Sequence, residues 1–104
     1  MYVTIRFVVE RTLIRSFRHK GLGQFFGGST AKGISAPHRP RIERMLDRLD
    51  AANAPRDMNL PGWRFHGLHG ERRGRWAVAV SGNLRLTFAF DGEDAVDVDL
   101  EDYH

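Results

Sequence analysis

The sequence predicts a single α+β domain in which two N-terminal helices cover one face of a largely antiparallel sheet. Its apolar residues recur at helical spacing in the first half of the chain and alternate with a period of two in the last third. The 104 residues are enough to build one hydrophobic core and too few for two. We therefore expect a small domain with its helices first and most of its sheet last.

The first 36 residues predict short elements separated by turns. Residues 2–9 and 13–17 contain apolar residues at strand-like spacing, so short strands are plausible at both places. Residues 21–26 could form a short helix that turns three apolar side chains inward, those of Leu22, Phe25 and Phe26. The Gly27–Gly28 pair would end this helix because glycine readily adopts positive φ. Residues 27–36 are then expected to form a loop.

The strongest helical signal follows Pro37 and Pro40, which a helix tolerates only in its first turn. Apolar residues then fall at positions i, i+3, i+4 and i+7, namely Ile42, Met45, Leu46 and Leu49. This helix is expected to end near Ala52 or Asn53. Its other face carries mixed charges, which are more typical of a solvated surface than of a partner site.

The last third of the chain predicts a hairpin and a further strand. Residues 76–80 and 84–90 alternate apolar and other residues around the turn-forming Ser81–Asn83, and Asp91–Gly92 provides a second turn. The final predicted strand spans Ala95–Leu100. Its alternation predicts that Val96, Val98 and Leu100 face one way. The acidic residues between and after them would face the other way, namely Asp97, Asp99 and Glu101.

The formal charge of +3 hides an uneven distribution along the chain. Seven of the 13 acidic residues follow residue 90, so residues 1–90 carry 16 basic and 6 acidic groups, a net +10. Such a body would attract a polyanion, although a soluble arginine-rich surface explains the charge equally well. Only Lys20 and Lys32 are lysines. The planar arginine fork suits phosphate contacts and stacking on bases, which favours RNA or DNA as the partner.

Composition also excludes several classes of protein. The chain has no cysteine, which rules out a disulfide scaffold, a thiol nucleophile and thiolate metal sites. No apolar run approaches the roughly 20 residues needed to span a bilayer. The first ten residues also lack the pattern of a signal peptide. We therefore expect a cytoplasmic protein without a membrane partner.

No familiar catalytic motif is present, but histidines and arginines gather around the predicted hairpin. A metal site built from His66, His69 and the terminal Asp102 and His104 is conceivable, yet their spacing favours a surface loop without metal. Metal-free RNA cleavage needs only a general base, a general acid and cations, roles that histidine, arginine and aspartate can fill. Tyr103 could stack on a base, whereas a frayed terminus without function is the alternative.

Four segments, in order, resemble the HigB branch of the RelE-type toxins. Residues 14–21 resemble the family's opening, and residues 46–52 resemble its second helix. The third segment is the central hairpin, with motifs in residues 68–76 and 83–88, and the fourth is the terminal triplet Asp102–His104. The resemblance covers residues 13–104 and implies a RelE-like fold. Residues 1–12 have no counterpart, so they are either an extra strand or, as we favour, an extension upstream of the usual start at Leu13.

The resemblance implies the toxin of a type II toxin-antitoxin system, a metal-independent and ribosome-dependent mRNA endonuclease that inhibits translation and growth. It implies a proton relay of His66, His104 and Asp102, charge neutralisation by Arg85 and base stacking by Tyr103. His69 stands where relatives often carry lysine, so it would either stabilise charge or exchange protons. We expect the loop arginines to contact RNA, namely Arg72, Arg73 and Arg75. No cofactor or metal is implied.

The resemblance also implies partners. These are the ribosome with its mRNA and a HigA-like antitoxin with a helix-turn-helix domain, through which any contact with DNA would be indirect. The helix face with Arg41, Arg44 and Arg48 is a candidate surface for the antitoxin. Two alternatives remain: a non-catalytic nucleic-acid-binding module, and a ParE-like gyrase inhibitor of the same fold. The Asp102–His104 ending argues against the second.

Overall fold

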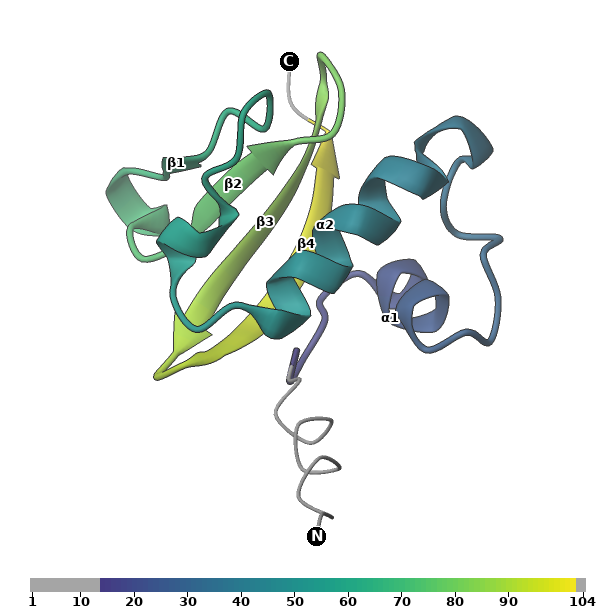
Figure 1. The fold of residues 1–104 in the computed structure, drawn as a ribbon, viewed down its shortest axis with the longest axis horizontal. Helices are drawn as coiled ribbons and strands as arrows, with labels where there is room; N and C mark the ends of the chain where they lie inside the picture. The colour runs from purple at the N-terminus through teal and green to yellow at the C-terminus, as the bar shows by residue number, and fades with distance from the viewer. Residues whose placement is uncertain (1–13, 103–104) are drawn as a thin grey trace, which may run out of the picture.

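The computed structural model describes residues 14–102 (Figure 1). The strand predicted at residues 2–9 and the terminal Tyr103 and His104 lie outside these residues. In chain order, the helical elements are α1 (Lys20–Phe26), η2 (Ala36–His38), α2 (Arg39–Ala51), η3 (Pro55–Met58) and η4 (Gly70–Arg72). The strands are β1 (His66–Gly67), β2 (Trp76–Ala79), β3 (Leu84–Asp91) and β4 (Asp94–Asp102). No helix in residues 14–102 is long and apolar enough to cross a bilayer.

The four strands form one antiparallel sheet in the order β1-β2-β3-β4, so each strand pairs with the next one along the chain. The predicted hairpin is confirmed, with Val78 opposite Leu86 and Ala77 opposite Thr87. β1 is only two residues long and pairs with the beginning of β2. The α+β class and the antiparallel sheet are therefore as the sequence predicts.

Helix α2 supplies the centre of the hydrophobic core. Its four predicted core residues, Ile42, Met45, Leu46 and Leu49, are all fully buried. They pack with side chains from the facing side of the sheet, including Val78, Leu86, Phe88 and Val98. Figure 1 shows α2 lying across the sheet on the side of β3 and β4. Burying an apolar side chain of this size contributes about 1.5–3 kcal/mol, so this interface is a major source of stability.

Helix α1 is short and depends on local caps. The ring Nδ1 of His19 accepts a hydrogen bond from the Leu22 amide at 3.0 Å and so caps the helix N-terminus. Gly27 follows the last residue, and Gly28 adopts φ +82°, where glycine is favoured. Leu22 is fully buried, which fixes the helix to the core.

The segment before α1 runs beside β4 without forming a regular strand. Two isolated parallel bridges join Ile14 to Ala95 and Phe17 to Val98. β4 carries a bulge between them, where Asp97 adopts φ +53° and its amide donates to Ser16 Oγ at 2.8 Å. The extra residue shifts the alternation of the strand.

The bulge overturns part of the predicted facing of the last strand. Val98 is fully buried and Leu100 packs against the core, as the alternation predicts. Ahead of the bulge, however, the fully buried core residue is Ala95, and Val96 does not belong to the core cluster. The extra residue of a bulge reverses which side chains face the core, so the alternation after the bulge cannot be extended to the residues before it.

Candidate functional site

The side of the sheet opposite α2 is polar along β3 and β4. Arg85 pairs with Ala79 on one side and Glu101 on the other, and Thr87 pairs with Ala77 and Asp99. Paired residues in an antiparallel sheet point to the same face, so these side chains share a face that alternates with the buried Leu86 and Phe88. The alternation of Arg85 with Leu84 and Leu86 in the sequence predicts a polar-face position for Arg85, and the register agrees with it.

Glu101, on the edge strand β4, is contacted by three side chains of this face. Arg72 Nη2 donates to its Oε2 at 2.5 Å, and the Thr87 hydroxyl donates to the same oxygen at 2.7 Å. Arg85 Nη2 lies 3.4 Å from the other carboxylate oxygen, Oε1. The Glu101 side chain is 18% exposed, so water screens the attraction between these charges less than it would at an exposed position.

The electrostatics of Glu101 follow from these contacts. Burial alone would raise the pKa of its carboxyl, but hydrogen bonds from Arg72 and Thr87 and the charges of Arg72 and Arg85 outweigh burial. The pKa of Glu101 falls to about 2 as a result. The same hydrogen bond raises the pKa of Arg72. Glu101 is therefore an anion throughout the neutral range and holds two arginines beside it.

Arg75 holds Thr87, one of the donors to Glu101, in position. Its Nη2 donates to Thr87 Oγ1 at 2.9 Å and to the carbonyl of the bulge residue Asp97 at 2.8 Å. Because the Thr87 hydroxyl accepts from Arg75, its only hydrogen is directed to Glu101. Arg75 is only 8% exposed, and burial lowers the pKa of its guanidinium. The expectation that Arg75 contacts RNA is therefore corrected: it is a buried support.

His66 lies on the same face of the sheet at its other edge. It pairs with Ala77, which in turn pairs with Thr87, and its side chain is exposed. The ring Nδ1 lies 2.8 Å from the carbonyl oxygen of Arg64. A carbonyl can only accept, so Nδ1 is the donor and Nε2 of the neutral ring keeps a free lone pair. His66 Nε2 is therefore the ring nitrogen that makes no hydrogen bond to Arg64 and is available to a ligand.

The loop between β1 and β2 brings the remaining predicted residues to this face. His69 is exposed and directly precedes η4, the single turn that carries Arg72 to Glu101. Gly70, the first residue of η4, and Gly74, which follows it, adopt φ +67° and +97°, where glycine is favoured. Arg73 is exposed. The structure therefore brings His66, Arg72 and Arg85 to one face, with His69 and Arg73 in the adjoining loop.

Asp102 does not join this cluster. It pairs with Leu84, one residue further along than the Arg85–Glu101 pair, and so faces the opposite side of the sheet. There it lines a cavity of about 340 Å³ together with His38, Ile42 and Leu100. The predicted sites Tyr103 and His104 lie outside the described residues.

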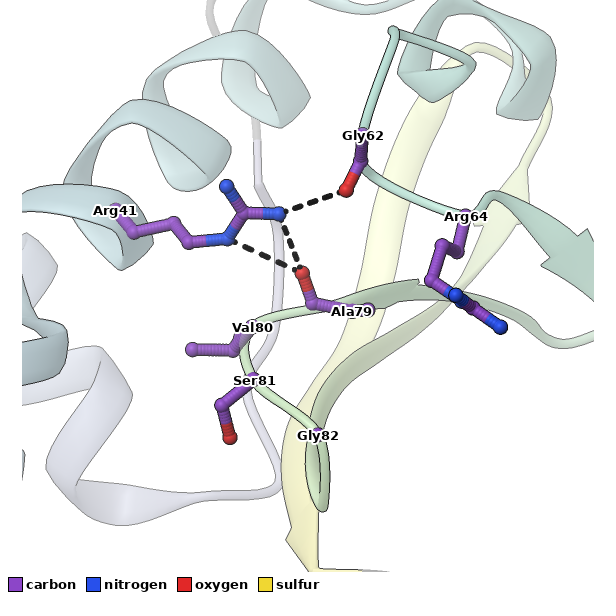
Figure 2. Close-up of a pocket in the computed structure, with 7 residues that line it drawn as sticks. All are labelled: Arg41, Gly62, Arg64, Ala79, Val80, Ser81 and Gly82. Carbon is purple, nitrogen blue, oxygen red and sulfur yellow. Dashed lines mark hydrogen bonds between the residues drawn. The ribbon is translucent and has the colours of Figure 1, made fainter.

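A larger cavity, of about 480 Å³, lies beside the end of β2 (Figure 2). Its lining is Arg41, Gly62, Arg64, Ala79, Val80, Ser81 and Gly82. Arg41 donates to the carbonyls of Ala79 and Gly62 at 2.9 and 3.0 Å and so joins α2 to the sheet edge. The lining includes no histidine or carboxylate, whereas His66 and Glu101 lie on the sheet face described above.

Two further observations bear on partners. Arg48 donates to the Asp57 carbonyl at 2.9 Å, so two of the three arginines proposed as an antitoxin surface hold the fold together. Within residues 14–102, no three histidine or carboxylate side chains come together in a group that could hold a metal ion.

Sequence reasoning gave no role to Glu101 and used Thr87 only as part of a motif. The sequence pattern did place both residues on the polar face. Thr87 lies two residues from Arg85 in the same predicted strand, and Glu101 belongs to the acidic side of the last predicted strand. The missing information was the register, which places Glu101 directly opposite Arg85.

The fold and the site define a small α+β domain whose polar sheet face carries histidine and arginine side chains. Residues 15–104 match the family described as the RelE-like toxin of the type II toxin-antitoxin system HigB, and the chain belongs to this family. The chain is also similar to a protein named Endoribonuclease HigB from Proteus vulgaris. The two are 37% identical over 92 residues, which cover 88% of this chain and 100% of that relative.

Proposed function

We propose that this toxin is a metal-independent endoribonuclease that cleaves mRNA on the ribosome in the cytoplasm and so stops translation and growth. The observation that carries the proposal is the shared sheet face of His66, Arg72 and Arg85 in a HigB family member. The name of its Proteus vulgaris relative supports the endoribonuclease activity. We further propose that the domain has the RelE-like fold, with α1 and α2 on one face of the sheet.

The cleavage would use the 2′-hydroxyl of the RNA as the nucleophile. His66 Nε2 takes the proton of this hydroxyl, and the resulting oxyanion attacks the adjacent phosphorus. Arg85 stabilises the negative charge that develops on the phosphorane. The 5′-oxygen then leaves with a proton from the general acid, for which His104 is our candidate. The products are a 2′,3′-cyclic phosphate, or the 3′-phosphate formed from it, and a 5′-hydroxyl.

The other predicted residues would have supporting roles. Tyr103 would stack on the base at the cut, and His69 would contribute charge beside His66. Arg72 and Arg73 would contact the RNA backbone. Since Asp102 faces the other side of the sheet, we propose that it orients the terminal dipeptide and does not meet the scissile phosphate. We further propose that residues 13–104 form the toxin domain and residues 1–12 an extension, because the family match begins at residue 15.

The partners would be the translating ribosome and an antitoxin of the HigA type, with contact to DNA only through that antitoxin. Membership of a type II toxin family supports an antitoxin partner. Since Arg41 and Arg48 are engaged within the fold, we do not place the antitoxin on that helix face.

Induction of the full chain in growing cells tests the function. We expect growth arrest and cleavage of a reporter transcript, but no cleavage of the same transcript when its start codon is removed. His66→Gln should abolish both effects while the protein remains folded. Growth arrest with intact transcripts and altered plasmid supercoiling would instead favour a gyrase inhibitor. Unchanged function after replacement of His66 and Arg85 would favour a non-catalytic nucleic-acid-binding module.

A further inference from the structure

We propose that Glu101 is a counter-anion built into the RNA-binding face of the toxin. In the free protein it occupies the arginines that a substrate phosphate would use, and RNA must displace it from Arg72 in order to bind. The inference rests on the proposed function, because it assumes that this face binds RNA.

Two arginines from different elements approach the carboxylate of Glu101. Arg72 comes from η4 and Arg85 from β3, and they approach different oxygens of Glu101, at 2.5 and 3.4 Å. A carboxylate and a phosphate present a similar pair of charged acceptor oxygens to a guanidinium. The two arginines therefore surround a small oxyanion before any RNA is bound.

The side chains that contact Glu101 differ in how easily they can exchange it for another acceptor. Thr87 is fully buried, fixed on β3 and held by Arg75, so its bond to Glu101 belongs to the rigid sheet. The Arg72 side chain is 39% exposed and stands on a single turn between Gly70 and Gly74. Arg72 can therefore turn from Glu101 to a phosphate while Thr87 keeps Glu101 in place.

Glu101 is poorly suited to the main alternative role, that of the general base. A carboxyl with a pKa of about 2 binds a proton too weakly to abstract one efficiently near neutral pH. Its side chain is also committed to three donors, Arg72, Arg85 and Thr87. Glu101 is thus better suited to hold cations than to move protons.

The test is RNA binding by the full chain and by Glu101→Gln, with Glu93→Gln as the matched control. Glutamine keeps the shape and can still accept from Thr87, but it lacks the charge that competes for Arg72. Glu93 is exposed in the β3–β4 turn, so its replacement makes the same change in net charge away from the site. The probe is a short single-stranded RNA with 2′-O-methyl groups throughout, which cannot be cleaved by 2′-hydroxyl attack.

We expect Glu101→Gln to lower the Kd for this RNA by about tenfold, the effect of one charge-assisted hydrogen bond. The slope of log affinity against log salt should steepen by about 0.7, because one more cation reaches the phosphates. Glu93→Gln should change the Kd by less than about twofold, since exposed distant charges are screened by salt. If Glu101→Gln does not fold, Glu101→Asp should tighten binding in the same direction, because its shorter side chain withdraws from Arg72.

Equal or weaker binding by Glu101→Gln relative to Glu93→Gln overturns the proposal, and so does equal or weaker binding by a folded Glu101→Asp. Loss of mRNA cleavage without tighter binding would instead make Glu101 a catalytic or structural group. The function fails separately if the unmodified chain cuts no translated mRNA. If Glu101→Gln binds RNA more tightly in that case, the counter-anion proposal stands, and this face of the sheet binds RNA without cleaving it.

Discussion

Acidification should destabilise the toxin by removing the charge of Glu101. The pKa of this carboxyl is about 2 in the folded protein, against an ordinary value of 4.5. Each pKa unit corresponds to about 1.4 kcal/mol, so the ionised side chain stabilises the fold by about 3 kcal/mol at neutral pH. Because folding depresses the pKa, this stability is fully present above about pH 4.5 and is lost as the pH falls toward about 2. About 2 kcal/mol should be lost by about pH 3.

The assay is the free energy of unfolding in urea, measured between about pH 6 and about pH 3 for the parent and for Glu101→Gln. The other carboxylates titrate in both proteins, so the difference between the two curves isolates Glu101. We expect the parent to lose about 2 kcal/mol more than the variant across this range. Parallel curves would refute the argument, since they would mean that Arg72 and Thr87 do not hold the ionised form preferentially.

Three further changes test the fold that supports the site. Leu46→Ala removes a fully buried side chain of α2 and should lower the free energy of unfolding by about 3 kcal/mol, measured in urea, with RNA affinity per folded molecule unchanged. Arg41→Met should cost about 1–3 kcal/mol because the Ala79 carbonyl loses both donor contacts, and a binding titration should find RNA affinity unchanged. Ser16→Ala removes the acceptor of the Asp97 amide and should lower the melting temperature by several degrees, about 1–2 kcal/mol, whereas Ser16→Thr should keep most of this stability.

The fold was largely predictable because its hydrophobic pattern is regular. Ile42 to Leu49 repeat at helical spacing, and Trp76 to Phe90 alternate around a turn, so local periodicity defined α2 and the central hairpin. The bulge at Asp97 was not predictable. It depends on Ser16, which lies 81 residues earlier in the chain and accepts the displaced amide.

The site was predictable only where the family motif carries it. Strand alternation identified the face of Arg85, whereas the pairing of His66 with Ala77, which puts His66 on the same face, had no signal in the sequence. The positions of Glu101 and Asp102 depend on the register between β3 and β4. This register sets Glu101 opposite Arg85 and places Asp102 on the other side of the sheet. The burial of Arg75 likewise follows from tertiary contacts with Thr87 and Asp97, which a sequence pattern does not reveal.

Cleavage of a translated mRNA by purified toxin tests the central claim most directly. In a reconstituted translation reaction, the parent should cut the message at the ribosome and leave a 5′-hydroxyl on the downstream fragment. Arg85→Gln should be slower by about a hundredfold or more, because the cation that stabilises the phosphorane is lost. Arg44→Gln, the same change at an exposed position of α2, should cut at the parental rate. Equal rates for all three proteins would contradict the assignment of the active site to this face of the sheet.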